Sequence, residues 1–386
     1  MDFALSPDEE ALVAGAERAC REHLAPLAAE ARASGDLAPL RQAMAAQGLL
    51  GLNLPPQYGG VGLPLLTTLL VLRTVQSVDT TLGGLTHRTS TGAVGAILHL
   101  GTEWQKEHFV ARVARGEIGI SIGITEPDAG SAATALKTTA RIDGDNVRIN
   151  GQKCFITAAK DNHYTVVYCR FGTTGKAADI GAVIVPHDAP GFHRSSGTRN
   201  MADELQYELF FDDCVVPRTH VLADGNAFGR LIGVYDTERL GSIARMLGCA
   251  KAAYQHAVAY VQERKQFGRE LADFQGLQWM LADMRVKLDA AELLCFRAAA
   301  NIDAGRGTPL EVSIAKVYTA QAAKEICDDA IQLFGGYGYM QDYPVERLYR
   351  EVRGGSIYGG TVQIHKNMIA GHVLGRRIRQ TKPGNT

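Results

Sequence analysis

The sequence has little net charge, no long apolar run and no paired cysteine motif. Forty lysines and arginines stand against 41 aspartates and glutamates, a formal net charge of −1. This balance argues against a broad nucleic-acid surface and against a polybasic membrane anchor. No run of about 18 apolar residues occurs, so we expect no transmembrane helix. The acidic start, Met-Asp-Phe-Ala-Leu-Ser-Pro-Asp-Glu-Glu, is not typical of a signal peptide.

The seven cysteines are scattered along the chain, and none forms a Cys-x-x-Cys pair. An odd count without such spacing favours free thiols that act as small apolar side chains, which fits a reducing, cytoplasmic compartment. The 11 histidines show no spacing typical of metal ligands, so we expect no metal site.

What the chain does contain is a change of pattern along its length. Its 386 residues, 46% of them apolar, are enough for two or three domains. Residues 1–118 are helical in pattern and open with a Ser-Pro-Asp-Glu-Glu string at Ser6, which is typical of a helix cap. Residues 119–225 contain short strand-like runs bounded by glycine and proline. Residues 226–386 return to long helical patterns.

The middle region carries two turn signals. The run from Arg141 to Ile149 alternates around Gly144, and Asn150-Gly151 is a strong hairpin signal. Short strands of this kind predict a small β-barrel or sandwich. The fold class we expect is therefore α+β, with an N-terminal helical domain, a middle β domain and a C-terminal four-helix bundle.

Four strings are candidates for binding and chemistry. They are Ile124-Thr-Glu-Pro-Asp-Ala-Gly-Ser131, Cys154-Phe-Ile-Thr157, Glu263-Arg-Lys-Gln-Phe-Gly268 with Phe274-Gln275, and the tail from Gln332 to Thr361. Each has a plain structural alternative: a surface turn, a core strand, a basic helix end or a glycine cap. Taken together, in this order and spacing, they resemble the acyl-CoA dehydrogenases, a family of flavin enzymes. The resemblance runs from about Leu12 to Leu374.

The resemblance implies FAD as the cofactor. A turn of small residues lets backbone N–H groups approach polar ligand atoms. Phe155, where the family has tryptophan, would pack on the flavin ring, and Thr157 would contact the flavin near N5. Arg264 would bind the pyrophosphate through a charge-assisted fork. The implied FAD contacts are Ile124, Thr125, Ser131, Phe155, Ile156, Thr157, Arg264, Gln266, Phe267, Phe274, Gln275, Gln332, Leu333, Phe334, Gly335, Gly336, Thr361 and Gln363.

The tail lacks the glutamate that many family members use as their catalytic base. They carry it within Tyr-Glu-Gly-Thr, whereas this chain has Tyr358-Gly359-Gly360-Thr361. Glu238 falls where another branch, which includes isovaleryl-CoA dehydrogenase, carries its glutamate. Two carboxylates in one pocket would repel each other, so the exchange is electrostatically reasonable. The resemblance implies Glu238 as general base and the Gly359 N–H as a donor to the thioester oxygen. A solvated surface glutamate is the alternative.

The absent side chain at Gly359 should leave room for a branched or bulky short acyl group. The thioester carrier, coenzyme A or an acyl carrier protein, stays open. Arg88 would either meet a carboxylated acyl group or lie on the surface. The positions that resemble the family's thioester contacts are Ser131, Asp236, Arg239, Tyr358 and Gly359.

The resemblance thus implies an FAD-dependent acyl-thioester dehydrogenase that passes electrons to an electron-transfer flavoprotein. Shared FAD contacts in the family imply a homotetramer, or at least a dimer. Two other functions are open. One is a flavin monooxygenase or oxidase on the same scaffold, which does not need this carboxylate. The other is a non-catalytic FAD-binding homologue, suggested by loss of the tail glutamate.

Overall fold

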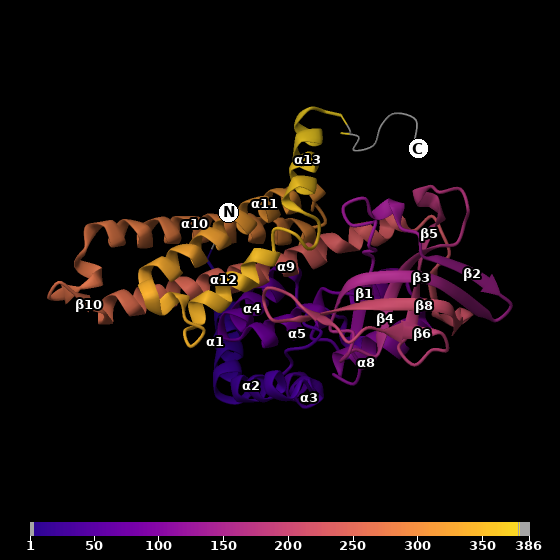
Figure 1. Ribbon diagram of the computed structural model, residues 1–386, viewed down its shortest axis with the longest axis horizontal. Coiled ribbons are helices and arrows are strands. Elements are labelled where there is room, and N and C mark those ends of the chain that lie inside the picture. Colours follow the sequence, from indigo (N-terminus) through magenta and orange to yellow (C-terminus); the bar gives the residue numbers. More distant parts are fainter. Residues whose placement is uncertain (1–3, 377, 379–386) are drawn as a thin grey trace. The chain divides into compact units, whose positions relative to one another are not determined.

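The structure is a computed structural model that describes residues 4–376 and 378 (Figure 1). The chain forms two compact units that alternate along the sequence. Within the described residues, the helical unit comprises 4–28, 64–84 and 239 onward, and the sheet unit comprises 29–63 and 85–238. The outer limits of the predicted domains, 1 and 386, lie outside the described residues.

The described residues are mostly helical. The α-helices are α1 (Pro7–Ala19), α2 (Ala25–Ser34), α3 (Ala38–Ala46), α4 (Leu65–Val78), α5 (Thr80–Ser90), α6 (Val94–Leu100), α7 (Glu103–Gln105), α8 (Ala111–Ala114), α9 (Phe228–Glu263), α10 (Gln275–Asp303), α11 (Pro309–Phe334), α12 (Pro344–Gly354) and α13 (Val362–Val373). Short turns and short π- or 3₁₀-helical segments connect most neighbouring helices, but the strands of the sheet separate α8 from α9 and a short β-hairpin separates α9 from α10.

In the helical unit, long helices pack on one another around a common apolar core. α11 packs against α10, α12 and α13, and α4 packs against α1 and α10 (Figure 1). Four apolar side chains of α9 are fully buried in that core: Leu240, Ile243, Leu247 and Ala250. Their period of three to four residues places these side chains on one face of the helix.

Two helix starts follow their sequence signals. Ser6 caps α1, because its hydroxyl accepts a hydrogen bond from the Glu9 N–H and the Glu9 carboxylate accepts one from the Ser6 N–H. Thr308 caps α11, with Pro309 in its first turn. The cap predicted at Ser6 is confirmed.

The sheet unit holds a nine-stranded mixed sheet. Its path runs β6-β8-β3-β2-β4-β5-β9, with β1 parallel to β4 and β7 paired to β8. The strands are β1 (Ile120–Gly123), β2 (Thr139–Asp143), β3 (Asn146–Thr157), β4 (Tyr164–Arg170), β5 (Ile180–Pro186), β6 (Phe192–Arg194), β7 (Thr198–Arg199), β8 (Leu205–Pro217) and β9 (Val221–Ala223). The short β10 (Lys265–Gln266) and β11 (Arg269–Glu270) form a separate hairpin between α9 and α10.

The central strands are buried on both faces. Val166 and Tyr168 of β4 join one apolar core, while the alternating Val167 and Cys169 join another. Strands covered on both sides read as continuous apolar runs, which explains the sequence from Tyr164 to Cys169. The seven cysteines are all free and buried, so their predicted role as small apolar side chains is confirmed. Of the described helices, none is long and apolar enough to cross a membrane.

One turn prediction is right and the other is wrong. β2 and β3 pair in register around Gly144, as expected. Asn150-Gly151 is not a hairpin: it lies inside β3, where the register with β8 shifts between Ile149 and Gly151. A Cβ on Gly151, with φ 143°, would stand 2.6 Å from the Thr138 hydroxyl oxygen. The glycine therefore serves a bulge and a close approach of chains.

Candidate active site

In the sheet unit, the loop after β1 is tied to the end of β3. The Thr125 carbonyl accepts a hydrogen bond of 2.9 Å from the Cys154 N–H. The Ile124 carbonyl accepts one of 3.0 Å from Nζ of Lys153. Two of the four candidate strings, far apart in sequence, are therefore held together by direct contacts.

A buried ion pair anchors this loop. Lys153 Nζ lies 2.7 Å from Oε1 of Glu126, and the two side chains are 0% and 6% exposed. The N–H groups of Lys137 and Thr138 also donate to the Glu126 carboxylate, so both ends of the loop converge on it. Burial raises the pKa of Glu126, but the bond from Lys153 and the backbone donors outweigh it, and the net pKa is lowered. Burial lowers the pKa of Lys153.

The second string presents an aromatic side chain outward. Phe155 has φ 58° and exposes 73% of its surface, while Ile156 beside it is buried. The β3–β8 register shifts between Lys153 and Ile156, which lets Phe155 leave the strand alternation. The Thr157 hydroxyl donates to Oε1 of Gln206 at 3.1 Å. Ser131, at the far end of the loop, is exposed.

Glu238 lies in the sheet unit, in the N-terminal third of α9. Its side chain is only 15% exposed, and its Oε1 is 3.7 Å from Nε2 of His87 on α5. The same Nε2 lies 3.3 Å from the Glu238 backbone carbonyl oxygen. Tyr168 of β4, whose ring is 6.2 Å from that of Tyr235, is also an electrostatic neighbour of Glu238. Asp236 is half-buried on the same helix.

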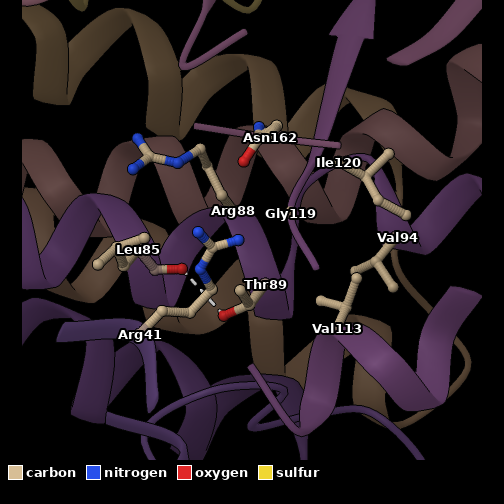
Figure 2. Close-up of a pocket in the computed structure, with 9 residues that line it drawn as sticks. All are labelled: Arg41, Leu85, Arg88, Thr89, Val94, Val113, Gly119, Ile120 and Asn162. Atoms are coloured by element: carbon tan, nitrogen blue, oxygen red, sulfur yellow. Dashed lines mark hydrogen bonds between the residues drawn. The ribbon is translucent and has the colours of Figure 1, made fainter. Parts of the chain in front are cut away.

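Arg88 follows His87 on α5 and lines a small cavity of about 10 Å³ (Figure 2). Its side chain is 19% exposed, and its guanidinium lies 3.6 Å from the Glu204 carboxylate. Figure 2 shows the Arg41 guanidinium directed into the middle of the lining residues, whereas that of Arg88 extends away from Val94 and Val113. Arg88 is thus neither a solvated surface arginine nor directed at the apolar part of this cavity.

In the helical unit, Gly359 occupies a tight, fixed turn. Its φ of 66° lies in the left-handed region that favours glycine. Its carbonyl oxygen accepts from Nε of Arg239 at 3.1 Å and from Nε2 of His365 at 3.2 Å. Nδ1 of His365 meets the Ser313 hydroxyl at 3.1 Å. Burial lowers the pKa of His365 to about 4, which keeps the ring neutral near pH 7.

The neighbours of this turn complete the tail motif. The Thr361 hydroxyl accepts from the Ile364 N–H and so caps α13. The Tyr358 ring has the buried Lys316 Nζ 4.9 Å from its centroid. Gln363 is exposed on the first turn of α13. Gly359 and Glu238 belong to different compact units.

A larger pocket in the helical unit joins the other two strings. It has a volume of about 530 Å³ and lies between the β10–β11 hairpin and the end of α11. Arg264 lines it from one side, 5.4 Å from the Tyr337 ring centroid. Gly335, with φ 62°, ends α11. The lining residues are Tyr260, Arg264, Gln266, Leu271, Leu277, Gln332, Leu333, Phe334, Gly335, Gly336, Tyr337 and Met340.

The other residues assigned to this string are not in the lining of the pocket. Phe267 is 94% exposed, and its ring is 6.3 Å from that of Phe274. Phe274 also stacks under the Arg269 guanidinium at 3.9 Å. Gln275 begins α10. Among the described residues, no group of three or more histidine, cysteine and acidic side chains could hold a metal ion.

Comparison with known families settles the kinship. The chain matches the acyl-CoA dehydrogenase N-terminal domain over residues 6–117, the middle domain over 121–214 and the C-terminal domain over 228–374. This protein belongs to the acyl-CoA dehydrogenase family. The predicted combination of helical and sheet regions is confirmed at that level. The prediction of an oxidoreductase that acts on acyl-CoA with FAD is confirmed as well.

Family relatives match the chain over nearly its full length. A short-chain-specific acyl-CoA dehydrogenase of Clostridium acetobutylicum is 33% identical, with 97% of this chain and 100% of the relative covered. A 3-sulfinopropanoyl-CoA desulfinase of Paraburkholderia xenovorans is 35% identical, with 98% and 99% covered. The solved butyryl-CoA dehydrogenase of Megasphaera elsdenii has a TM-score of 0.91 at 30% identity, with 97% and 100% covered.

Sequence reasoning did not single out three polar residues of this acyl-CoA dehydrogenase. Lys153 directly precedes the Cys154 string, and a lysine among apolar strand residues could have suggested a buried ion pair. His87 directly precedes Arg88, and only Arg88 was considered as a site residue in that part of the sequence. His365 sits four residues after Thr361, one helical turn away, and its contact with Gly359 depends on how the tail folds back.

Proposed function

We propose that this protein catalyses α,β-dehydrogenation of a short or branched acyl-CoA, or of an acyl thioester on a carrier protein, with Glu238 removing the α-proton. The observation that carries this proposal is the largely buried Glu238 carboxylate beside His87. Burial disfavours the charged form of a carboxylate and makes it a stronger proton acceptor than a solvated one. The tail motif has Gly359 where many members of the family carry a glutamate, so it supplies no carboxylate base of its own.

The residues assigned to FAD fit a large, partly polar ligand. Gly335 and Gly336 have no atom within 4 Å of where a Cβ would stand, so backbone and ligand can approach closely there. Arg264 offers a planar fork of donors suited to a pyrophosphate. The exposed ring of Phe155 offers a face for a flat heterocycle. Bound FAD would supply the acceptor for the hydride that leaves the β-carbon.

The thioester would be held by the tail turn. We assign its carbonyl oxygen to the Gly359 N–H, which would acidify the α-carbon by stabilising developing negative charge. Arg239 and His365 fix the same residue through its carbonyl, which supports a preorganised donor. The missing side chain at Gly359 would leave room for a branch near the α- or β-carbon. The proposed substrate contacts are Ser131, Asp236, Arg239, Tyr358 and Gly359.

The proposal extends to assembly, partners and architecture. We assign an electron-transfer flavoprotein as the acceptor, and a homotetramer, or at least a dimer, because FAD contacts are shared between subunits in this family. A cytoplasmic location accords with seven free thiols. Domains at 1–118, 119–225 and 226–386 are proposed as a helical domain, a small β-barrel or sandwich and a four-helix bundle.

The test is anaerobic mixing of the flavin-loaded enzyme with linear, branched and dicarboxylic acyl-CoAs, followed by flavin absorbance. We expect bleaching by short or branched substrates, and at least a thousandfold slower bleaching in Glu238→Gln with flavin still bound. Glu117→Gln is the matched control, because its carboxylate is 45% exposed on the surface. Full activity of Glu238→Gln would refute the role of this residue, and a strong preference for linear chains would refute the branched-substrate assignment.

The same experiment separates the alternatives. Similarity to a desulfinase and a dehydrogenase at nearly equal identity means that identity alone does not choose the reaction. Bleaching only by NAD(P)H or free reduced flavin would indicate a monooxygenase. Purified protein that binds no flavin would indicate a non-catalytic homologue.

A further inference from the structure

His87 is a buried histidine that no step above uses. It lies on α5 in the sheet unit and is 7% exposed. Its Nε2 is 3.3 Å from the backbone carbonyl oxygen of Glu238. A carbonyl oxygen can only accept a hydrogen bond, so Nε2 must carry the proton in this contact. Nε2 is therefore the ring nitrogen of His87 that donates.

The same N–H lies close to the carboxylate of Glu238. Oε1 is 3.7 Å from Nε2, beyond a direct hydrogen bond but within range of charge–dipole attraction in a site closed to water. The donor therefore fixes the helical turn from which Glu238 projects and also stabilises the ionised form of its side chain. Stabilising the ionised carboxylate keeps the base ready to accept a proton at lower pH.

We propose that His87 is a positioning residue for Glu238, holding the carboxylate in place and in its ionised form through Nε2–H. The proposal rests on Glu238 being the base, as proposed above. His87 itself takes no proton from the substrate.

Other ionisable groups near the pair come from three elements. On β4, burial raises the pKa of Tyr168, so its phenol stays neutral across the working range. On α9, Tyr235 and Asp236 precede Glu238 and Arg239 follows it. On α5, Arg88 lies near the Glu204 carboxylate at 3.6 Å. Because these groups are the same in wild type and in His87 variants, comparing the variants isolates the contribution of His87.

The test is the pH dependence of single-turnover flavin reduction by a saturating acyl-CoA. An N–H donor lowers the pKa of a carboxylate, so its removal raises that pKa. In His87→Leu we expect the acidic limb of the pH–rate profile to move to higher pH by roughly half a unit. At pH values below the acidic limb the rate should fall about threefold, while the rate at pH 9 stays within about twofold of wild type. His87→Gln, which keeps an N–H near the Nε2 position, should restore the limb.

A structural role alone would not produce this pattern. It would change flavin retention or KM at all pH values and would not distinguish leucine from glutamine. If His87→Leu does not fold, His87→Asn, whose shorter amide cannot reach Glu238, carries the same expectation. His99→Gln, on exposed α6 surface, is the histidine control. The proposal is overturned if the acidic limb of the pH–rate profile does not move in His87→Leu or His87→Asn. It is also overturned if the limb moves by the same amount in His87→Gln. Full activity of Glu238→Gln would instead overturn the base assignment.

Discussion

Replacing Lys153 with methionine should destabilise the sheet unit more than any exposed substitution in the same loop. The side chain of Lys153 is fully buried and its Nζ contacts both Glu126 and the Ile124 carbonyl. Methionine fills a similar volume but leaves the Glu126 carboxylate buried without its cation. Breaking a buried pair in this way costs about 3–5 kcal/mol.

We expect the loss of stability in Lys153→Met to lie at the lower end of that range. Glu126 keeps its backbone donors from Lys137 and Thr138, which compensate part of the charge. We expect a loss of about 3 kcal/mol, which for a unit of this size is a drop of about 6–12 °C in Tm. The loop from Ile124 should also loosen, so flavin retention on gel filtration should fall.

Thermal denaturation of three variants tests this reasoning. Lys137→Met is the matched control, because Lys137 pairs with Asp128 on the surface, where both side chains are 73% exposed, and should change stability by under about 0.5 kcal/mol. Adding Glu126→Gln to Lys153→Met removes the unpaired charge and should recover about half of the loss. A Lys153→Met variant within about 1 kcal/mol of wild type would refute the argument.

Three further outcomes follow from the site. Arg264→Ala should weaken FAD binding by roughly 10- to 100-fold in fluorescence titration, because one charge-assisted fork is lost; unchanged affinity would remove the pocket from the FAD site. His365→Leu should slow flavin reduction about tenfold and His365→Gln much less, since only glutamine can still donate to Gly359; equal rates would count against that role. The pKa of Glu126 is lowered in the folded protein, so its ionised carboxylate stabilises the fold at pH values above its unfolded pKa, roughly 4.3. That stabilisation is lost as the pH falls through the pKa of Glu126 in the folded state. Acid titration of Glu126→Gln should therefore show a shallower loss of stability than wild type.

The sequence was a reliable guide where the physics is local. The helix cap at Ser6 depends on residues three positions apart, and it forms as expected. The turn at Gly144 also forms as expected, because the strands that flank it are adjacent in sequence. The hairpin prediction at Asn150-Gly151 was wrong because a bulge and a hairpin favour the same residue types. Only pairing with the partner strand β8 distinguishes them.

The order and spacing of the motifs by themselves determined the family, the dependence on FAD and the absence of a glutamate from the tail. Only the tertiary structure decided what surrounds the remaining groups. Lys153 meets Glu126, His87 meets Glu238 and His365 meets Gly359, at separations of 27, 151 and 6 residues along the chain. Side-chain environments of this kind depend on how strands and helices pack, and packing brings together residues whose sequence positions carry no mutual signal.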